Sequence, residues 1–434
     1  MRRLALASTL LIAATSLAFA QEAPPLVGPP VEPLAQAPAM ASPPPPPPPA
    51  RARPESSTDE GGLWGVSDRA EQQARASGQL ETDPALNAYV RDVACRVAAE
   101  YCGDIRLYIM NRPFFNASMA PNGYMEVWSG LLLRAEDEAQ LAFVLGHETA
   151  HYGERHSLEA LRATRARATG AMIASVVIAA AGTAAAVNSP NSASSISDVT
   201  RIAVDAVYLG TIASLFGFSR ENETEADNVG FDHAVAANYD PSAGQRIWTS
   251  LMAETAASDN PDTRRRETRG SIFSTHPLSA ERVEALSARA AAHSGTGQTH
   301  RERYRAVIRP FLDEWLRADL RRRDYGQTAH LLNQLAAHGE DLGVIEYYRG
   351  EICRLRRAEG DRASALQHYA NAIAHADAPA AAWRELGEFA ARDGRHAEAA
   401  AHFTTYLERA PNAEDRALVE ARLAQINAQT GGVQ

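Results

Sequence analysis

The sequence is poor in cysteine and has no excess of positive charge, and both deficits restrict its function. Three cysteines among 434 residues fit an oxidising compartment only loosely. The net charge of −10 would repel a phosphate backbone, so we expect no nucleic-acid partner. The hydrophobic content of 45% and charged content of 22% are ordinary for a soluble globular protein, and the length allows two or three domains.

Long apolar runs are also scarce. Residues 170–187 are Ala-rich and have about the minimum length of a membrane span, but they include two glycines, a serine and a threonine. A second apolar run, 202–218, is interrupted by Asp205. We favour buried or cleft-covering helices for both runs and keep transmembrane helices as the alternative, so we expect at most peripheral membrane association.

The N-terminus predicts export. Arg2 and Arg3 precede an apolar stretch, 4–17, and Ala18-Phe19-Ala20 is a small-x-small cleavage site before Gln21. This order is typical of a secretory signal peptide at residues 1–20. No cysteine follows the site, which argues against a lipoprotein. In a bacterium the processed chain would reside in the periplasm, with peripheral contact to the outer membrane as a further option. Residues 21–61 include the proline run 43–49 and are predicted to be a disordered linker.

The cysteines leave one question open. Cys95 and Cys102 are seven residues apart, and a continuous helix would separate their Cα atoms by about 10 Å, too far for a disulfide. Gly103 indicates that the helix ends nearby, so a disulfide and two buried thiols are both compatible with the sequence. Cys353 is expected to be unpaired and buried.

A small sheet is predicted upstream of the central motif. Residues 68–77 and 84–100 have helical patterns, and the second helix begins with Asp83 as its cap. Apolar residues alternate along 105–109, and 114–120 and 124–128 are two further extended segments separated by a Pro-Asn-Gly turn. A protease cleft needs such an edge strand to bind an extended substrate.

The central motif is H-E-x-x-H. Residues 137–145 predict a helix that continues into His147, Glu148 and His151. Two histidines four apart leave the same face of a helix and can bind one metal ion, and the glutamate between them can accept a proton from water. The helix is expected to end near Gly153, and we did not assign His156 as a ligand. The metzincin pattern is excluded because Glu154 and Ser157 stand where glycine and histidine are required.

A third ligand is expected in the acidic segment 219–230. A helix there offers two carboxylate pairs four apart, Glu223 with Asp227 and Glu221 with Glu225. In a zinc site the first carboxylate of such a pair binds the metal and the second accepts the ring N–H of a ligand histidine. Periodicity does not decide between the two pairs.

Five motifs together resemble one protein family. They are Asn116-Ala117, the W-S-G-L-L of 128–132, H-E-x-x-H, the S-R-x-x-E-x-E-A-D-x-x-G of 219–230, and Thr275-His276-Pro277 with Arg282. This combination, spread over roughly 63–287, resembles the CAAX-prenyl-protease and HtpX-type gluzincin zinc metallopeptidases. We therefore expect a peptidase domain at 62–290.

The resemblance implies a role for each matched residue. One Zn²⁺ per chain would be held by His147, His151 and Glu223, with Glu148 as general base. Asp227 would orient His147, and the edge strand at Asn116 and Ala117 would bind substrate. His276 would either stabilise the transition state or cap the zinc as a reversible fourth ligand, the alternative being a helix cap, and Arg282 would anchor its loop.

The last third contains an internal repeat. Small and aromatic residues at tetratricopeptide spacing recur 34 residues apart; they are Gly360, Ala365 and Tyr369, then Gly394, Ala399 and Phe403. We expect a tetratricopeptide array at 300–434 that binds partners or serves as a structural cap.

The predicted fold is therefore mainly α. It consists of an α+β zincin-like peptidase domain with a small sheet, followed by an all-α repeat array. The predicted function is a zinc endopeptidase of the cell envelope. The family resemblance implies misfolded or stalled envelope proteins, such as outer-membrane β-barrels, as its substrates, and the outer-membrane assembly machinery as a partner of the repeats. A periplasmic chaperone that acts mainly by binding is the alternative, and the sequence does not indicate an oligomeric state.

Overall fold

The structure is a computed structural model that describes residues 50–167, 217–265, 276 and 279–431. The predicted signal peptide, residues 21–49 of the predicted linker and the apolar run 170–187 lie outside these residues, as does the run 202–218 up to residue 216. Helix α1 begins at Asp59, within the last residues of the predicted linker. Among the helices of the described residues, none is both long and apolar enough to cross a membrane.

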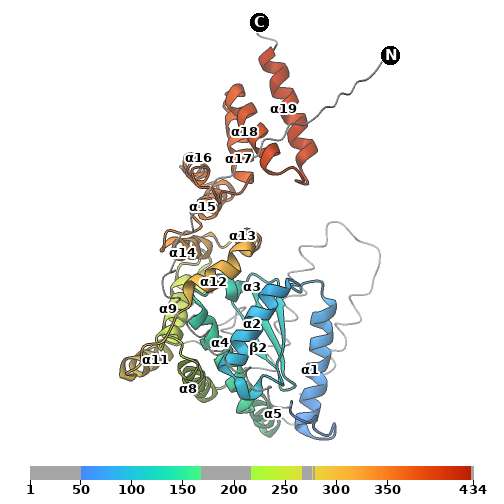
Figure 1. Ribbon diagram of the computed structural model, residues 1–434, viewed down its shortest axis with the longest axis vertical. Helices are drawn as coiled ribbons and strands as arrows, with labels where there is room; N and C mark the ends of the chain where they lie inside the picture. The colour runs from blue at the N-terminus through green and yellow to red at the C-terminus, as the bar shows by residue number, and fades with distance from the viewer. Residues whose placement is uncertain (1–49, 168–216, 266–275, 277–278, 432–434) are drawn as a thin grey trace, which may run out of the picture. The chain divides into compact units, whose positions relative to one another are not determined.

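Helices dominate the fold, and a small sheet lies among them (Figure 1), which confirms the predicted mainly α class. The helices before residue 300 are α1 (Asp59–Ala76), α2 (Pro84–Val97), α3 (Ser129–Arg134), α4 (Glu138–Gly153), α5 (His156–Arg167), α8 (Arg220–Ala236), α9 (Ala243–Ala256), α10 (Pro261–Arg265) and α11 (Ala280–Ala292). Those after it are α12 (Arg301–Ile308), α13 (Leu312–Leu320), α14 (Tyr325–Ala336), α15 (Leu342–Arg356), α16 (Asp361–Ala372), α17 (Ala381–Arg392), α18 (His396–Arg409) and α19 (Arg416–Gly431).

The sheet has three strands in the order β1-β3-β2. The strands are β1 (Arg106–Met110), β2 (Ala117–Met119) and β3 (Tyr124–Trp128), with β1 parallel and β2 antiparallel to the central β3. The backbone groups along β2 point alternately toward β3 and away from it. Those of Asn116 and Ala120 point toward β3, because the Trp128 amide donates to the Asn116 carbonyl at 3.0 Å and the Ala120 amide to the Tyr124 carbonyl at 2.7 Å. The backbone groups of Ala117 and Met119 therefore point away from β3, toward the outer edge of the sheet.

Helix α4 is at the centre of the N-terminal part. It begins after Asp137, whose side chain accepts a hydrogen bond from the Gln140 amide at 2.9 Å. The helix is buried along almost its whole length and packs against α2, α8, α9 and β2. Gly230 permits the contact between α4 and α8, because a Cβ atom at this position would lie only 2.8 Å from the backbone nitrogen of His147. The last residue of the 219–230 motif is therefore explained by a close approach of two backbones.

Helices α12 to α14 pack on the N-terminal part through buried polar contacts. The Tyr304 hydroxyl on α12 donates to the Leu132 carbonyl at 2.5 Å. Arg134, which follows the sheet, is 4% exposed and contacts Glu254 on α9 at 2.7 Å and Asp319 on α13 at 2.6 Å. The hydrophobic core runs through both regions without interruption. The boundary between the predicted domains stays a prediction.

We expect Asp319 to make the free energy of unfolding depend on pH in the acidic range. Burial opposes its ionisation, but Arg134 and Arg322 outweigh burial and lower the pKa of Asp319 to about 2, from 3.8. Its contribution, roughly 2 kcal/mol, is present above the unfolded pKa and is lost as the pH falls from about 4 to about 2. Asp319→Asn should therefore show a lower melting temperature at about pH 6 and a smaller further drop at about pH 3 than wild type. Asp313→Asn, in an exposed ion pair with Arg317, is the control; equal pH dependence in all three proteins would contradict this prediction.

The C-terminal helices α15 to α19 pack as successive neighbours. Two glycines allow close contacts between them: a Cβ atom on Gly350 would lie 2.5 Å from Tyr369, and one on Gly387 would lie 2.8 Å from Phe403. Ala365 and Ala399 are completely buried. Small residues at these positions are what paired repeat helices require, while the identification as tetratricopeptide repeats stays a prediction.

The cysteines show where the predicted helix boundaries were wrong. The helix predicted for 84–100 ends at Val97, and a 3₁₀ turn at Ala99–Tyr101 follows. This break brings the Cα atoms of Cys95 and Cys102 within 4.8 Å, and the two residues form a disulfide. Cys353 is free and buried, as predicted.

Candidate metal centre

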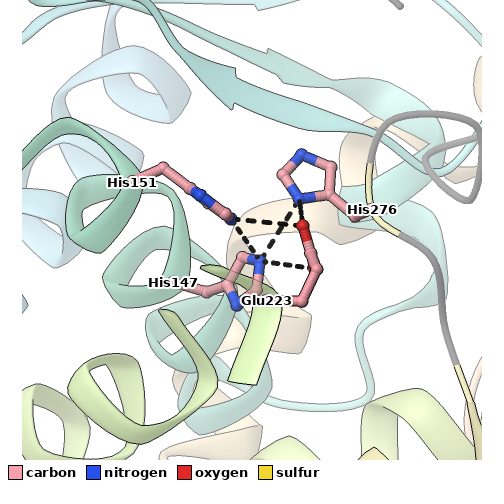
Figure 2. A group of neighbouring side chains, drawn as sticks. All are labelled: His147, His151, Glu223 and His276. Carbon is pink, nitrogen blue, oxygen red and sulfur yellow. Dashed lines mark hydrogen bonds and ion pairs between the residues drawn. The ribbon is translucent and has the colours of Figure 1, made fainter. Parts of the chain in front are cut away.

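The two histidines of α4 face each other at the centre of the site. His147 and His151 are one helical turn apart, and their Nε2 atoms lie 3.1 Å from each other. Both side chains are almost completely buried. Figure 2 shows the two rings together with Glu223 and His276, all four directed toward one common point.

Helix α8 supplies the carboxylate. The helix begins at a capping box, in which the Ser219 hydroxyl accepts from the Asn222 amide and the Asn222 side chain accepts from the Ser219 amide. Glu223, in the first turn, places Oε1 3.5 Å from His151 Nε2 and Oε2 3.6 Å from His147 Nε2. The structure thus places Glu223 and Asp227 on the buried face of α8, whereas Glu221 and Glu225 are exposed.

His276 reaches the same point from a different part of the chain. Its Nδ1 lies 3.3 Å from His147 Nε2 and 3.0 Å from Glu223 Oε1. Helix α11 begins four residues later and is capped by Ser279. The side chain of His276 is therefore directed into the cluster, and the cap of α11 is a different residue.

The donor set fits zinc. His147, His151, Glu223 and His276 are buried and each offers one ligand atom, all within 4.8 Å of one another. Zinc–nitrogen bonds of 2.0–2.1 Å in a tetrahedral arrangement place the nitrogens about 3.3 Å apart. The observed separations of 3.1 and 3.3 Å between ring nitrogens match this value. Buried imidazoles with one carboxylate are ligands that zinc prefers.

Burial and neighbouring charge shift the acid–base properties of the cluster. Burial, together with the other histidines, lowers the pKa of His151 well below its usual value, so its ring stays neutral and able to bind a metal. Burial raises the pKa of Glu148. At His276 burial opposes charge, but Glu148 and Glu223 outweigh it and raise the pKa.

Arg282 pairs with two buried carboxylates of α8, those of Glu223 and Asp227. Its guanidinium donates to Asp227 through Nε at 2.7 Å and Nη2 at 2.8 Å, while Nη1 lies 2.7 Å from Glu223 Oε2. Asp227 Oδ1 in turn lies 3.1 Å from His147 Nδ1. Burial opposes ionisation of Asp227, but Arg282 and His147 lower its pKa to about 2. Asp227 is therefore an anion that can fix the ring orientation of His147.

Glu148 lies beside the cluster and outside the ligand set. Its side chain is 1% exposed, and Oε1 lies 3.6 Å from His276 Nε2. At that distance the two groups attract each other without a hydrogen bond. A buried carboxylate with a raised pKa in this position can accept a proton at the site.

The predicted substrate residues lie on the neighbouring sheet edge. Asn116 directly precedes β2 and Ala117 is its first residue, and β2 packs against α4. The Asn116 side chain is 3% exposed, and its Oδ1 has no hydrogen-bond partner among the described residues.

Sequence reasoning did not identify several residues that lie beside the ligands, among them Phe218 and His156. Phe218 stacks on His151, with ring centroids 3.9 Å apart and an angle of 14° between the planes. His156 lies under the same ring, with its Nδ1 2.8 Å from His151 Nδ1. The only available signal for His156 was the expected end of the helix near Gly153, which should have prompted a search for contacts beyond a continuing helix.

Comparison with known proteins identifies the class of this domain. Residues 81–290 match Peptidase family M48, and this range includes α4, α8, β2 and His276. Residues 81–290, just under half of the chain, therefore resemble the zinc metallopeptidases of family M48. This match confirms the predicted resemblance, and the buried cluster fits the zinc ion that this family uses.

Curated relatives include two kinds of protease. The putative beta-barrel assembly-enhancing protease of Vibrio cholerae serotype O1 is 28% identical over 207 residues, 46% of this chain and 38% of the relative. The beta-barrel assembly-enhancing protease of Escherichia coli strain K12 is 24% identical over 288 residues, 62% of this chain and 55% of the relative. The mitochondrial metalloendopeptidase OMA1 of Schizosaccharomyces pombe is 30% identical over 206 residues, 46% of this chain and 51% of the relative. This chain thus spans about half the length of these relatives, or less.

Proposed function

We propose that the protein is a zinc metalloendopeptidase of the cell envelope. One observation carries this proposal: two imidazoles on one helix turn and a carboxylate from a second helix meet in a buried cluster, with Glu148 next to it. His147, His151 and Glu223 would hold one Zn²⁺ per chain. The metal, when bound, acts as a Lewis acid that polarises the scissile carbonyl and makes water more acidic.

In the proposed mechanism the side chains of this protein act as the general base and keep the metal ligands in position, and a strand edge binds the substrate. Glu148 accepts a proton from the attacking water and passes it to the leaving amine nitrogen. Asp227 and Arg282 keep His147 and Glu223 in position during this transfer.

The substrate would be an extended peptide segment. Ala117 and Met119 direct their backbone groups away from β3, and β2 packs against α4. An added strand there would form main-chain hydrogen bonds, which do not depend on side-chain identity. Unfolded or stalled proteins offer such segments, whereas a folded substrate would first have to unfold.

His276 defines a closed form of the site in this proposal. Its Nδ1 lies 3.3 Å from His147 Nε2 and 3.0 Å from Glu223 Oε1 and could serve as a fourth ligand, whereas a catalytic zinc site keeps one position open. His276 would therefore have to move away before substrate enters.

We expect His276→Ala to retain about one zinc per chain, because three ligands remain, and to raise kcat/KM for an unfolded protein. Metal analysis and cleavage of a fluorescent unfolded substrate provide the measurements. A fall in kcat with zinc retained would instead assign His276 to stabilisation of the transition state.

The location and the repeats complete the proposal. The predicted signal peptide and the two beta-barrel assembly-enhancing proteases among the relatives support a periplasmic protein that acts near the outer membrane. Substrates would be misfolded or stalled envelope proteins, and the repeats would bind them or the outer-membrane assembly machinery. Extraction of membranes with carbonate tests the location; retention in the membrane fraction would contradict peripheral association.

The second candidate is a chaperone that binds clients through α15–α19. The closely packed helices of that region favour it. The two functions are separated by Glu148→Gln: if cleavage of unfolded protein and any envelope phenotype are both unchanged, the protein acts by binding.

A further inference from the structure

His156 is a buried polar side chain outside the ligand set. It is 1% exposed and contacts His151 on the side opposite to the cluster. His151 Nε2 faces His147 Nε2 at 3.1 Å, while His151 Nδ1 faces His156 Nδ1 at 2.8 Å. The other ring nitrogen of His156, Nε2, lies 3.3 Å from Glu225 Oε2 on α8.

A break in the helix brings His156 to this place. Helix α4 ends at Gly153, and Arg155 has a left-handed backbone with φ of 59°. The next helix, α5, begins with His156 itself. The chain therefore turns over Glu154 and Arg155 and places His156 at the Nδ1 edge of His151, whereas a continuous helix would carry it to the far side.

With a metal at His151 Nε2, the hydrogen-bond geometry assigns the ring protons of His151 and His156. A histidine that offers Nε2 to a metal carries its proton on Nδ1. His151 Nδ1–H then donates to His156 Nδ1, which must be an acceptor. The proton of His156 therefore lies on Nε2 and is donated to Glu225 Oε2.

We propose that His156 and Glu225 are positioning residues that fix the tautomer and ring orientation of His151. This inference rests on the proposed zinc site. It gives each ligand histidine its own support: His147 is held directly by a carboxylate, Asp227, and His151 by a carboxylate acting through a second imidazole.

Phe218 completes the support of His151. Its ring stacks on the His151 ring at 3.9 Å, and this contact restricts tilting of the imidazole. The remaining freedom is rotation in the plane of the ring, which a hydrogen bond at Nδ1 removes. Glu225 contributes less than His156, because its side chain is 55% exposed and water can replace it.

The test measures zinc affinity of the full chain by competition with a chromophoric chelator. His156→Leu removes the acceptor and should weaken zinc binding about 10–100-fold. His156→Asn keeps an oxygen at the position of Nδ1 and should stay within about threefold of wild type. The zinc affinity of Glu225→Gln should lie between those of the two His156 variants. Glu221 is an exposed neighbour on α8, and Glu221→Gln should bind zinc as tightly as wild type.

The zinc affinities of these variants decide whether His156 supports His151. Wild-type affinity in folded His156→Leu would overturn the proposal, and so would equal loss in His156→Asn and His156→Leu. If the Leu variant does not fold, His156→Ala takes its place and must bind zinc more weakly than His156→Asn. If the wild-type chain binds no zinc, or His147→Ala binds it normally, the proposed zinc site fails and this inference fails with it, whereas normal zinc binding by wild type and by His156→Leu overturns this inference alone.

Discussion

Replacing Glu148 by Gln is expected to abolish most proteolysis while leaving the metal in place. Glutamine has the same shape but cannot accept a proton, so the loss of general base catalysis should lower kcat about 10²–10⁴-fold. Burial raises the pKa of Glu148, and this brings its proton affinity closer to that of an effective base near neutral pH. KM should change little, because Glu148 is not expected to bind the substrate. The measurement is the initial rate of cleavage of an unfolded reporter by zinc-loaded protein.

Glu154→Gln is the matched control for this variant. Glu154 follows the last residue of α4 and is exposed, so the same chemical change just beyond the end of this helix should leave kcat unaltered. Metal content, measured in parallel, shows whether zinc is retained. A Glu148→Gln protein that holds zinc and cleaves at the wild-type rate would exclude Glu148 as the base.

The helical spacing was sufficient to predict half of the site. His147 and His151 are local to one helix, and their separation of four residues fixes their common face. The choice between the two carboxylate pairs of α8 was not local, because both pairs have helical spacing. It depended on which face of α8 packs against α4, and the close approach of Gly230 to His147 is a property of two helices together.

Contacts between distant segments limited the rest of the prediction. The end of α4 at Gly153 was predicted, but the left-handed backbone of Arg155 was not, because no glycine stands at that position. The end of α2 at Val97 likewise decided the Cys95–Cys102 disulfide. Individual patterns predicted the helices and strands well, but where each element stops depends on what it packs against.

The contact between α13 and the N-terminal part could not be predicted from the sequence. Arg134 and Asp319 are 185 residues apart and join through a buried ion pair. Neither residue belongs to a motif, and charged residues are usually expected on the surface. Such a pair becomes visible only when the surrounding helices have enclosed it.

Glu223→Gln is expected to remove the metal. The variant replaces the only anionic ligand by a neutral amide of the same shape, and it also removes the charge that faces Arg282 Nη1 at 2.7 Å. Zinc content after dialysis against a chelator should fall from about one per chain to below about 0.1. Proteolysis should fall below detection for the same reason. Glu221→Gln, two residues earlier and exposed on α8, should keep both zinc and activity.

Thermal unfolding distinguishes loss of a ligand from loss of the fold. A metal that binds only the folded state raises the melting temperature with increasing concentration, so zinc should stabilise wild type and Glu221→Gln. The Glu223→Gln protein should melt at one temperature whether zinc is present or absent, and still show a cooperative transition, because Asp227 continues to pair with Arg282. If zinc instead stabilises Glu223→Gln as strongly as wild type, the two histidines and His276 are sufficient to hold the metal, and the carboxylate has to be removed from the ligand set.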